Sequence, residues 1–159
     1  EISACLVGSE MCIRDRAYVW QGLCFAGDVA AVHFPALPHV RVPTPPPEID
    51  LAAWRDSLAR LAELRPDQLL PTHFGPVSEE PAVHLQTVET QLASAADFVR
   101  AHWQAGQASQ AIIDAYKPWI AARALADGVD VAAAARFELI VPSEMCVQGL
   151  VRYFQKQTR

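Results

Sequence analysis

Prolines are concentrated in one short stretch of the chain, and this stretch constrains the fold more than any other feature. Six of the twelve prolines lie between positions 35 and 47, and three of them are consecutive at 45–47. Proline fixes φ and has no amide hydrogen, so this density excludes both a helix and a regular strand ladder. We therefore expect residues 29–47 to be irregular and to form a stiff surface loop.

The residues before this loop indicate a β-hairpin. Two short runs rich in aromatic and β-branched residues, 17–20 and 23–26, flank Gln21 and Gly22. The glycine suits the positive φ of a tight turn. The second predicted strand ends in Gly27 and Asp28.

After the loop the pattern becomes that of an amphipathic helix followed by a short strand. Apolar residues recur at steps of three and four over 51–64, and Asp50 is placed to cap the first turn. Residues 68–70 then read as a short buried strand, which leads into a loop at 71–76. The order strand, loop, helix, strand indicates an α/β layer.

From about residue 78 the pattern is helical throughout. We predict helices over 81–105, 108–126, 130–139 and 143–156, with glycines or prolines near their ends. This change of pattern divides the chain into 17–77, the α/β part, and 78–159, a helical C-terminal domain.

The first sixteen residues differ from the rest because they show neither a helical nor a strand period. Residues 6–16, LVGSEMCIRDR, resemble a sequencing adapter translated in one frame, CTC GTG GGC TCG GAG ATG TGT ATA AGA GAC. We interpret 1–16 as a non-native, adapter-derived segment and exclude it from reasoning about the fold. We expect it to make no regular contact with the rest of the chain.

Composition excludes several classes of partner. The net charge is −5 and no basic block is present, so we expect no nucleic-acid partner. No apolar run approaches the roughly 18 residues that a membrane span needs, and no signal peptide opens the sequence. Outside 1–16 the only cysteines are Cys24 and Cys146, too few for a disulfide framework or a cysteine zinc site. We expect a cytoplasmic protein without a membrane partner.

Two short motifs carry the candidate chemistry: FAGD at 25–28 and PTHFGP at 71–76. Singly, an aspartate after a strand is usually a turn residue and a histidine in a loop is usually solvated. Together, at the ends of two strands, Asp28 and His73 combine a hard oxygen ligand with an imidazole. We expect their side chains to lie within roughly 4–7 Å, since two residues that bind adjacent ions are held at about that separation.

With these motifs, the stretch 23–76 resembles the last third of a metallo-β-lactamase-fold domain. The proline-rich 43–47 and the helix at 54–64 resemble the glyoxalase II-like subgroup. The resemblance implies an α/β fold class, the C-terminal half of an αββα sandwich followed by an all-helical tail. It also implies that Asp28 bridges two zinc ions and that His73 ligates the second.

The resemblance implies a metal-dependent hydrolase that cleaves a small-molecule thioester, lactone or other ester with a metal-bound hydroxide. The family's upstream His-x-His-x-Asp-His loop is not in this sequence, so we expect the chain alone to be inactive. Iron in place of zinc, in a persulfide dioxygenase-like enzyme, is one alternative. A non-catalytic helical interaction module is another, and homodimerisation stays open.

The remaining polar candidates have weaker patterns. Arg41 could bind an anionic substrate. His33 and His39 lie in the irregular stretch 29–47 and could line a substrate entrance, but we expect solvated loop histidines there. His84 and His102 lie on a predicted helix, and we expect surface or packing roles for them.

Overall fold

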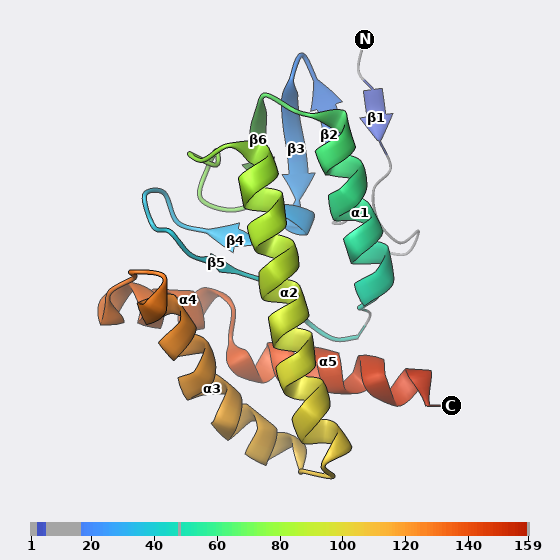
Figure 1. The fold of residues 1–159 in the computed structure, drawn as a ribbon, viewed down its shortest axis with the longest axis vertical. Coiled ribbons are helices and arrows are strands. Elements are labelled where there is room, and N and C mark those ends of the chain that lie inside the picture. The colour runs from blue at the N-terminus through green and yellow to red at the C-terminus, as the bar shows by residue number, and fades with distance from the viewer. Residues whose placement is uncertain (1–2, 6–16, 48, 159) are drawn as a thin grey trace. The chain divides into compact units, whose positions relative to one another are not determined.

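The computed structural model describes residues 3–5, 17–47 and 49–158 (Figure 1). The chain divides into two compact units. The first unit comprises residues 1–36 and 50–91, and the second comprises 37–49 and 92–159. The proline-rich stretch therefore belongs largely with the C-terminal helices.

A four-stranded sheet forms the centre of the first unit. It contains β1 (Ser3–Cys5), β2 (Ala17–Trp20), β3 (Leu23–Gly27) and β6 (Gln68–Pro71), in the order β1-β2-β3-β6. The predicted hairpin is confirmed, since β2 and β3 pair antiparallel and Gln21 and Gly22 at the turn both have positive φ. β6 instead pairs parallel with β3.

The crossover between β3 and β6 contains α1 (Leu51–Leu64), as the hydrophobic period predicts. Asp50 caps this helix, because its carboxylate accepts hydrogen bonds from the amides of Ala52 and Ala53. Two short elements, η2 (Asp28–Ala30) and β4 (Val32–His33), precede the proline-rich stretch. Since β3 and β6 are parallel, their carboxyl ends lie at the same edge of the sheet.

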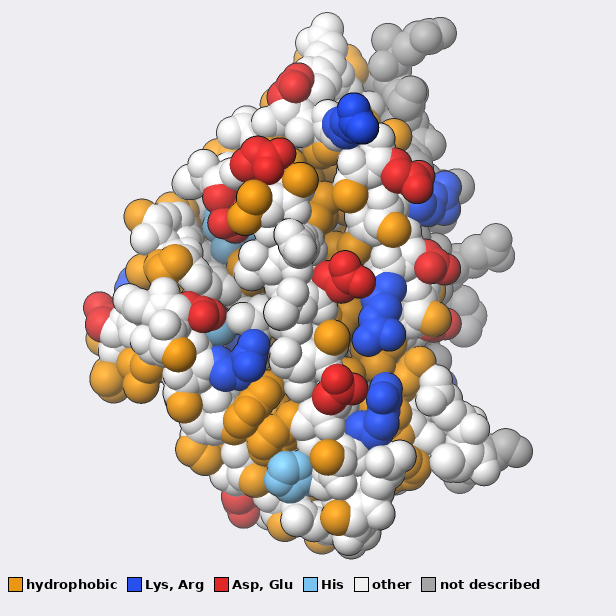
Figure 2. All heavy atoms as spheres, in the orientation of Figure 1, with side chains coloured by type: hydrophobic (Ala, Val, Ile, Leu, Met, Phe, Trp, Pro, Cys, Tyr) orange, Lys and Arg blue, Asp and Glu red, His pale blue; other side chains and the backbone are white. Residues whose placement is uncertain are grey.

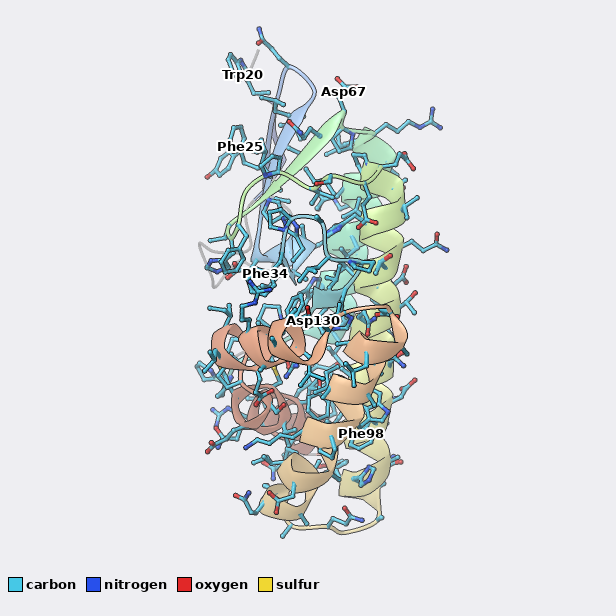
Figure 3. All side chains as sticks on the ribbon, turned by 90° about the vertical axis from the view of Figure 1, so that its left-hand side faces the viewer. Trp20, Phe25, Phe34, Asp67, Phe98 and Asp130 are labelled. Atoms are coloured by element: carbon cyan, nitrogen blue, oxygen red, sulfur yellow. The ribbon has the colours of Figure 1, made fainter. Side chains whose placement is uncertain are left out.

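The two faces of this sheet differ. One face is covered by α1 and by the first turns of α2 (Pro81–Gln104), and on it Cys24, Ala26 and Leu69 are fully buried. The alternate residues of the strands point the other way, where Tyr18, Trp20 and Phe25 are 43–46% exposed. Figure 3 shows Trp20 and Phe25 projecting from the side of the sheet opposite to α1.

Helices form most of the second unit. α3 (Ser109–Ala126), α4 (Val131–Ile140) and α5 (Ser143–Gln157) follow the end of α2, and α3 contacts both α4 and α5. These bounds confirm the four helices predicted after residue 78. Asp130 caps α4 by accepting a hydrogen bond from the amide of Ala133. The core between the helices contains Tyr116, Phe137 and Leu150.

The proline-rich stretch is not the surface loop that its composition predicts. Residues 39–42, including β5 (Val40–Arg41), are at most 3% exposed, and Thr44 is 1% exposed. The hydroxyl of Thr44 donates to the carbonyl of Cys146 in α5. The prediction failed because proline density excludes regular structure but says nothing about burial. Here the irregular backbone is covered by helices of the same unit.

The predicted fold class is also wrong. An αββα sandwich requires two sheets packed face to face. Within 3–5, 17–47 and 49–158 the structure instead has five α-helices of 10 to 24 residues, whereas no strand exceeds five residues. The chain is dominated by helices, because the hydrophobic pattern has a helical period from residue 81 onward.

The expectation for the N-terminal segment was partly wrong. Ser3–Cys5 forms β1 and pairs antiparallel with β2, with Ala4 opposite Tyr18. Residues 6–16, on which the resemblance to an adapter depends, lie outside the described residues. Nothing in the described ranges has both the length and the apolar character of a helix that spans a bilayer.

The charges on one face are mixed. Figure 2 shows acidic and basic side chains interspersed with apolar ones over α1, without a continuous patch of one sign. This face therefore has no strong local field that would favour a highly charged partner.

Candidate functional site

The fold brings Asp28 and His73 together. Asp28 directly follows β3, and His73 follows β6 after a single intervening residue. The amide of Thr72 donates to the carbonyl of Gly27 at 3.3 Å, which continues the parallel pairing to the ends of both strands. As a result Oδ1 of Asp28 lies 3.7 Å from Nε2 of His73, slightly closer than the interval expected from sequence.

The two facing atoms are not hydrogen bonded to each other, because 3.7 Å is too long. Oδ1 of Asp28 is itself buried and has no hydrogen-bond partner. The two side chains are nevertheless reachable from solvent, at 28% exposure for Asp28 and 45% for His73. A buried carboxylate oxygen without a partner is costly, and a cation beside it would remove that cost.

The distance suits two ligands of one metal ion. Zinc lies about 2.0–2.2 Å from its oxygen and nitrogen ligands, which places two ligands of a tetrahedral ion about 3.3–3.6 Å apart. A shift of a few tenths of an ångström would bring Asp28 and His73 to that separation. Within the part of the chain that the structure describes, no group of three or more His, Cys, Asp or Glu side chains could hold a metal. The pair therefore provides only part of a catalytic centre, which needs about three protein ligands.

The turn that carries Asp28 is fixed from three directions. The carbonyl of Asp28 accepts from the amide of Ala31, and the carbonyl of Val29 accepts from the indole Nε1–H of Trp54 in α1 at 3.0 Å. The carbonyl of Ala30 accepts from Nε2 of His84 in α2 at 2.9 Å. Every carbonyl of η2 is thus hydrogen bonded, so the backbone that positions Asp28 is rigid.

The loop that carries His73 is fixed by the segment that follows η2. Phe74 and Gly75 both have positive φ, so the chain turns sharply after His73. Nε2 of His33 donates to the carbonyl of Gly75 at 3.1 Å. The rings of Phe34 and Phe74 are in contact, with centroids 4.4 Å apart, and Figure 3 labels Phe34.

Sequence reasoning missed His33 and His84. His33 was expected to be solvated but is 5% exposed, whereas His84, for which surface and packing roles were both open, is 1% exposed. Their rings meet edge to face with centroids 5.8 Å apart. For His84 a signal was present, because it lies four residues before Val88 and so on the buried stripe of α2. For His33 the sequence carries no comparable signal, since the irregular segment around it has no period.

Arg41 lies in the second unit and is only 3% exposed. Its guanidinium donates to Oε2 of Glu138 at 2.9 Å and to the hydroxyl of Ser143 at 3.0 Å. Burial would raise the pKa of Glu138, but the hydrogen bonds from Ser143 and Arg41 outweigh it and hold this pKa below its ordinary value. These contacts tie Arg41 into the core, and the substrate-binding role suggested for it stays a prediction.

The other two histidines also have packing roles. Nδ1 of His39 is 2.7 Å from Asp127, and His39 is 1% exposed, so the expectation of a solvated side chain was wrong. Burial lowers the pKa of His39, and the hydrogen bond to Asp127 opposes this shift only in part. The ring of His102 stacks on Phe98 at 4.2 Å, in agreement with a packing role.

No protein-family model matches the sequence, and no curated protein matches it significantly. The functional proposal therefore depends on the geometry of Asp28 and His73.

Proposed function

We propose that Asp28 and His73 are two ligands of a metal-dependent hydrolase centre acting on a thioester, lactone or other small-molecule ester. The observation that carries this proposal is the buried, unpartnered Oδ1 of Asp28, which faces Nε2 of His73 at 3.7 Å. The resemblance of the two motifs to glyoxalase II-like members of the metallo-β-lactamase-fold family supports the same assignment. It does so through these two residues, and not through the sandwich architecture.

The chemistry of the pair suits the role. A carboxylate and an imidazole are ligands that zinc and iron both accept, and zinc is the ion we propose. Zinc, when bound, lowers the pKa of its water to about 7 and polarises the carbonyl to be cleaved. Asp28 presents its oxygen from a fixed turn, and the exposure of His73 leaves a path by which a small ester can approach from solvent. We place this reaction in the cytoplasm, where cysteine thiols stay reduced.

The simplest competing interpretation is an ordinary ion pair between Asp28 and a protonated His73. Such partly exposed pairs contribute about 0–1 kcal/mol and need no metal. The two interpretations differ in one respect that can be measured: only a metal site binds zinc in a way that requires both side chains.

Zinc titration by isothermal calorimetry separates them. We expect the wild-type chain to bind zinc weakly, because the described residues provide two ligands. Loss of outer-shell groups alone weakens metal sites roughly 10–100-fold, so Asp28→Asn and His73→Ala should each weaken binding at least that much. Asp56→Asn, which neutralises an exposed carboxylate on α1, is the matched control and should bind zinc as the wild type does. Equal zinc binding by all four proteins would contradict the proposal.

A further inference from the structure

We infer that His33 and His84 are positioning residues for the candidate site, each fixing one of the two segments that carry Asp28 and His73. This inference rests on the proposed function, since it concerns the geometry of that same pair. All four residues belong to the first unit.

His84 fixes the Asp28 side. Its Nε2 donates to the carbonyl of Ala30, the last residue of the turn that begins at Asp28. Its Nδ1 lies 2.8 Å from Oε1 of Glu79, which lies two residues before the start of α2. Because His84 lies on α2, its bond to the carbonyl of Ala30 attaches η2 to that helix, and the contact with Glu79 orients the ring.

His33 fixes the His73 side. It lies on β4, only five residues beyond Asp28, and its Nε2 donates to the carbonyl of Gly75, two residues beyond His73. Since the chain turns sharply at Phe74 and Gly75, this bond sets the direction in which the His73 loop leaves β6. The contact between Phe34 and Phe74 reinforces the same attachment.

The two histidines also contact each other. Their rings pack edge to face with centroids 5.8 Å apart, and both side chains are at least 95% buried. A continuous series of contacts therefore runs from η2 through His84 and His33 to the loop of His73. Displacing either ring would break the series of contacts between η2 and the loop of His73. The separation of Asp28 from His73 would then no longer be fixed.

The test uses three substitutions at each histidine. Glutamine places an amide donor close to the position of Nε2, whereas asparagine is too short to reach the same carbonyl and leucine has no donor. Val88→Ala truncates a buried side chain of α2, and it serves as the control for a general loss of stability. Cobalt(II) is titrated as a spectroscopic substitute for zinc, and binding is followed by the ring signals of His73. The nuclear Overhauser effect between Asp28 and His73 is measured without metal.

We expect His33→Leu and His84→Leu to weaken cobalt binding roughly 10–100-fold and to abolish the metal-free Overhauser effect. His33→Gln, His84→Gln and Val88→Ala should keep both within a few-fold of wild type. Folded leucine variants with wild-type cobalt binding and an intact Overhauser effect would overturn the inference. If the leucine variants do not fold, glutamine and asparagine variants that behave alike would overturn it. If cobalt does not shift His73 in the wild type, the proposed function fails, and the Overhauser effect alone then decides the positioning role.

Discussion

Asp28 and His39 each have one buried polar atom without a hydrogen-bond partner, but their other contacts differ. Oδ1 of Asp28 faces Nε2 of His73 without bonding to it, whereas His39 is bonded through Nδ1 to Asp127 and only its Nε2 has no partner. A buried polar atom without a partner is retained at a cost, which is typical of functional sites. A buried, bonded histidine instead affects stability, because folding restricts its protonation.

The stability of the folded chain should fall on mild acidification. Burial holds the pKa of His39 below 6.5, so the folded state binds fewer protons than the unfolded chain. The contribution of His39 is complete above pH 6.5 and is lost as the pH falls from 6.5 through the lowered pKa. His39→Asn keeps a donor toward Asp127 but cannot titrate. Thermal unfolding between about pH 7 and pH 5 should show a shallower loss of Tm for this variant than for wild type.

Part of the decrease of Tm with falling pH should remain in His39→Asn, because burial also lowers the pKa of His33. Parallel Tm profiles for wild type and variant would show that His39 does not titrate in this range.

At the level of elements, α5 depends on a glycine for its contact with the proline-rich stretch. A Cβ at Gly149 would overlap the carbonyl oxygen of Thr44 and lie 2.6 Å from Cδ1 of Ile49. Alanine in a helix interior ordinarily stabilises by about 1 kcal/mol relative to glycine. At this position the steric overlap reverses the sign.

We predict that Gly149→Ala lowers the free energy of unfolding by roughly 1–3 kcal/mol, the usual effect of overpacking. Urea denaturation followed by circular dichroism measures this change. Gln148→Ala, at the exposed neighbour on the same helix, should change stability by less than about 0.5 kcal/mol. A stabilising effect of Gly149→Ala would mean that α5 and Thr44 are not in close contact.

The open face of the sheet should promote self-association. Tyr18, Trp20 and Phe25 lie together there, with Tyr18 directly opposite Phe25. The double substitution Trp20→Thr and Phe25→Thr keeps β propensity while removing apolar surface. Light scattering as a function of concentration should show less association for this variant. Leu139→Ser, at a residue of α4 that is 79% exposed, is the control and should behave as wild type. Undiminished association of the double variant would contradict this role for the sheet face.

Elements with a clear period could be predicted from the sequence, and the others could not. α1 and the hairpin were predicted because Asp50, the apolar stripe of 51–64 and Gly22 are local signals.

The burial of 39–44 was not predicted, because it depends on contacts with Cys146 and Glu138, about a hundred residues away. In the site, the meeting of Asp28 and His73 followed from two strand ends, whereas His33 required knowledge of the three-dimensional contact with Gly75.

At the scale of the whole molecule, the helices determine the fold class. The number of protein ligands for a metal ion limits the reaction that the chain can catalyse. The αββα sandwich was expected from the resemblance of residues 23–76 and was extended to the rest of the chain. The helical period from residue 81 onward instead makes α-helices the main elements. The metal proposal does not depend on that extrapolation, because parallel pairing of β3 with β6 suffices to bring Asp28 beside His73.

The chain alone should bind zinc without hydrolysing esters. A catalytic zinc needs about three protein ligands, and the described residues offer two at this site. We predict no hydrolysis of a model thioester above the background of free zinc. A small rise of Tm with zinc, as mass action requires, should disappear in Asp28→Asn. Multiple-turnover hydrolysis that Asp28→Asn abolishes would show that the chain completes its own catalytic centre.

The most direct test of the metal proposal is anomalous diffraction at the zinc edge from crystals grown with zinc. We predict a peak within bonding distance, about 2.0–2.2 Å, of both Oδ1 of Asp28 and Nε2 of His73. Crystals of His73→Ala grown in the same way should lack this peak. A wild-type map with no peak at this position, and with Asp28 and His73 joined by a direct hydrogen bond, would show that the pair is a simple ion pair and contradict its assignment as a metal site.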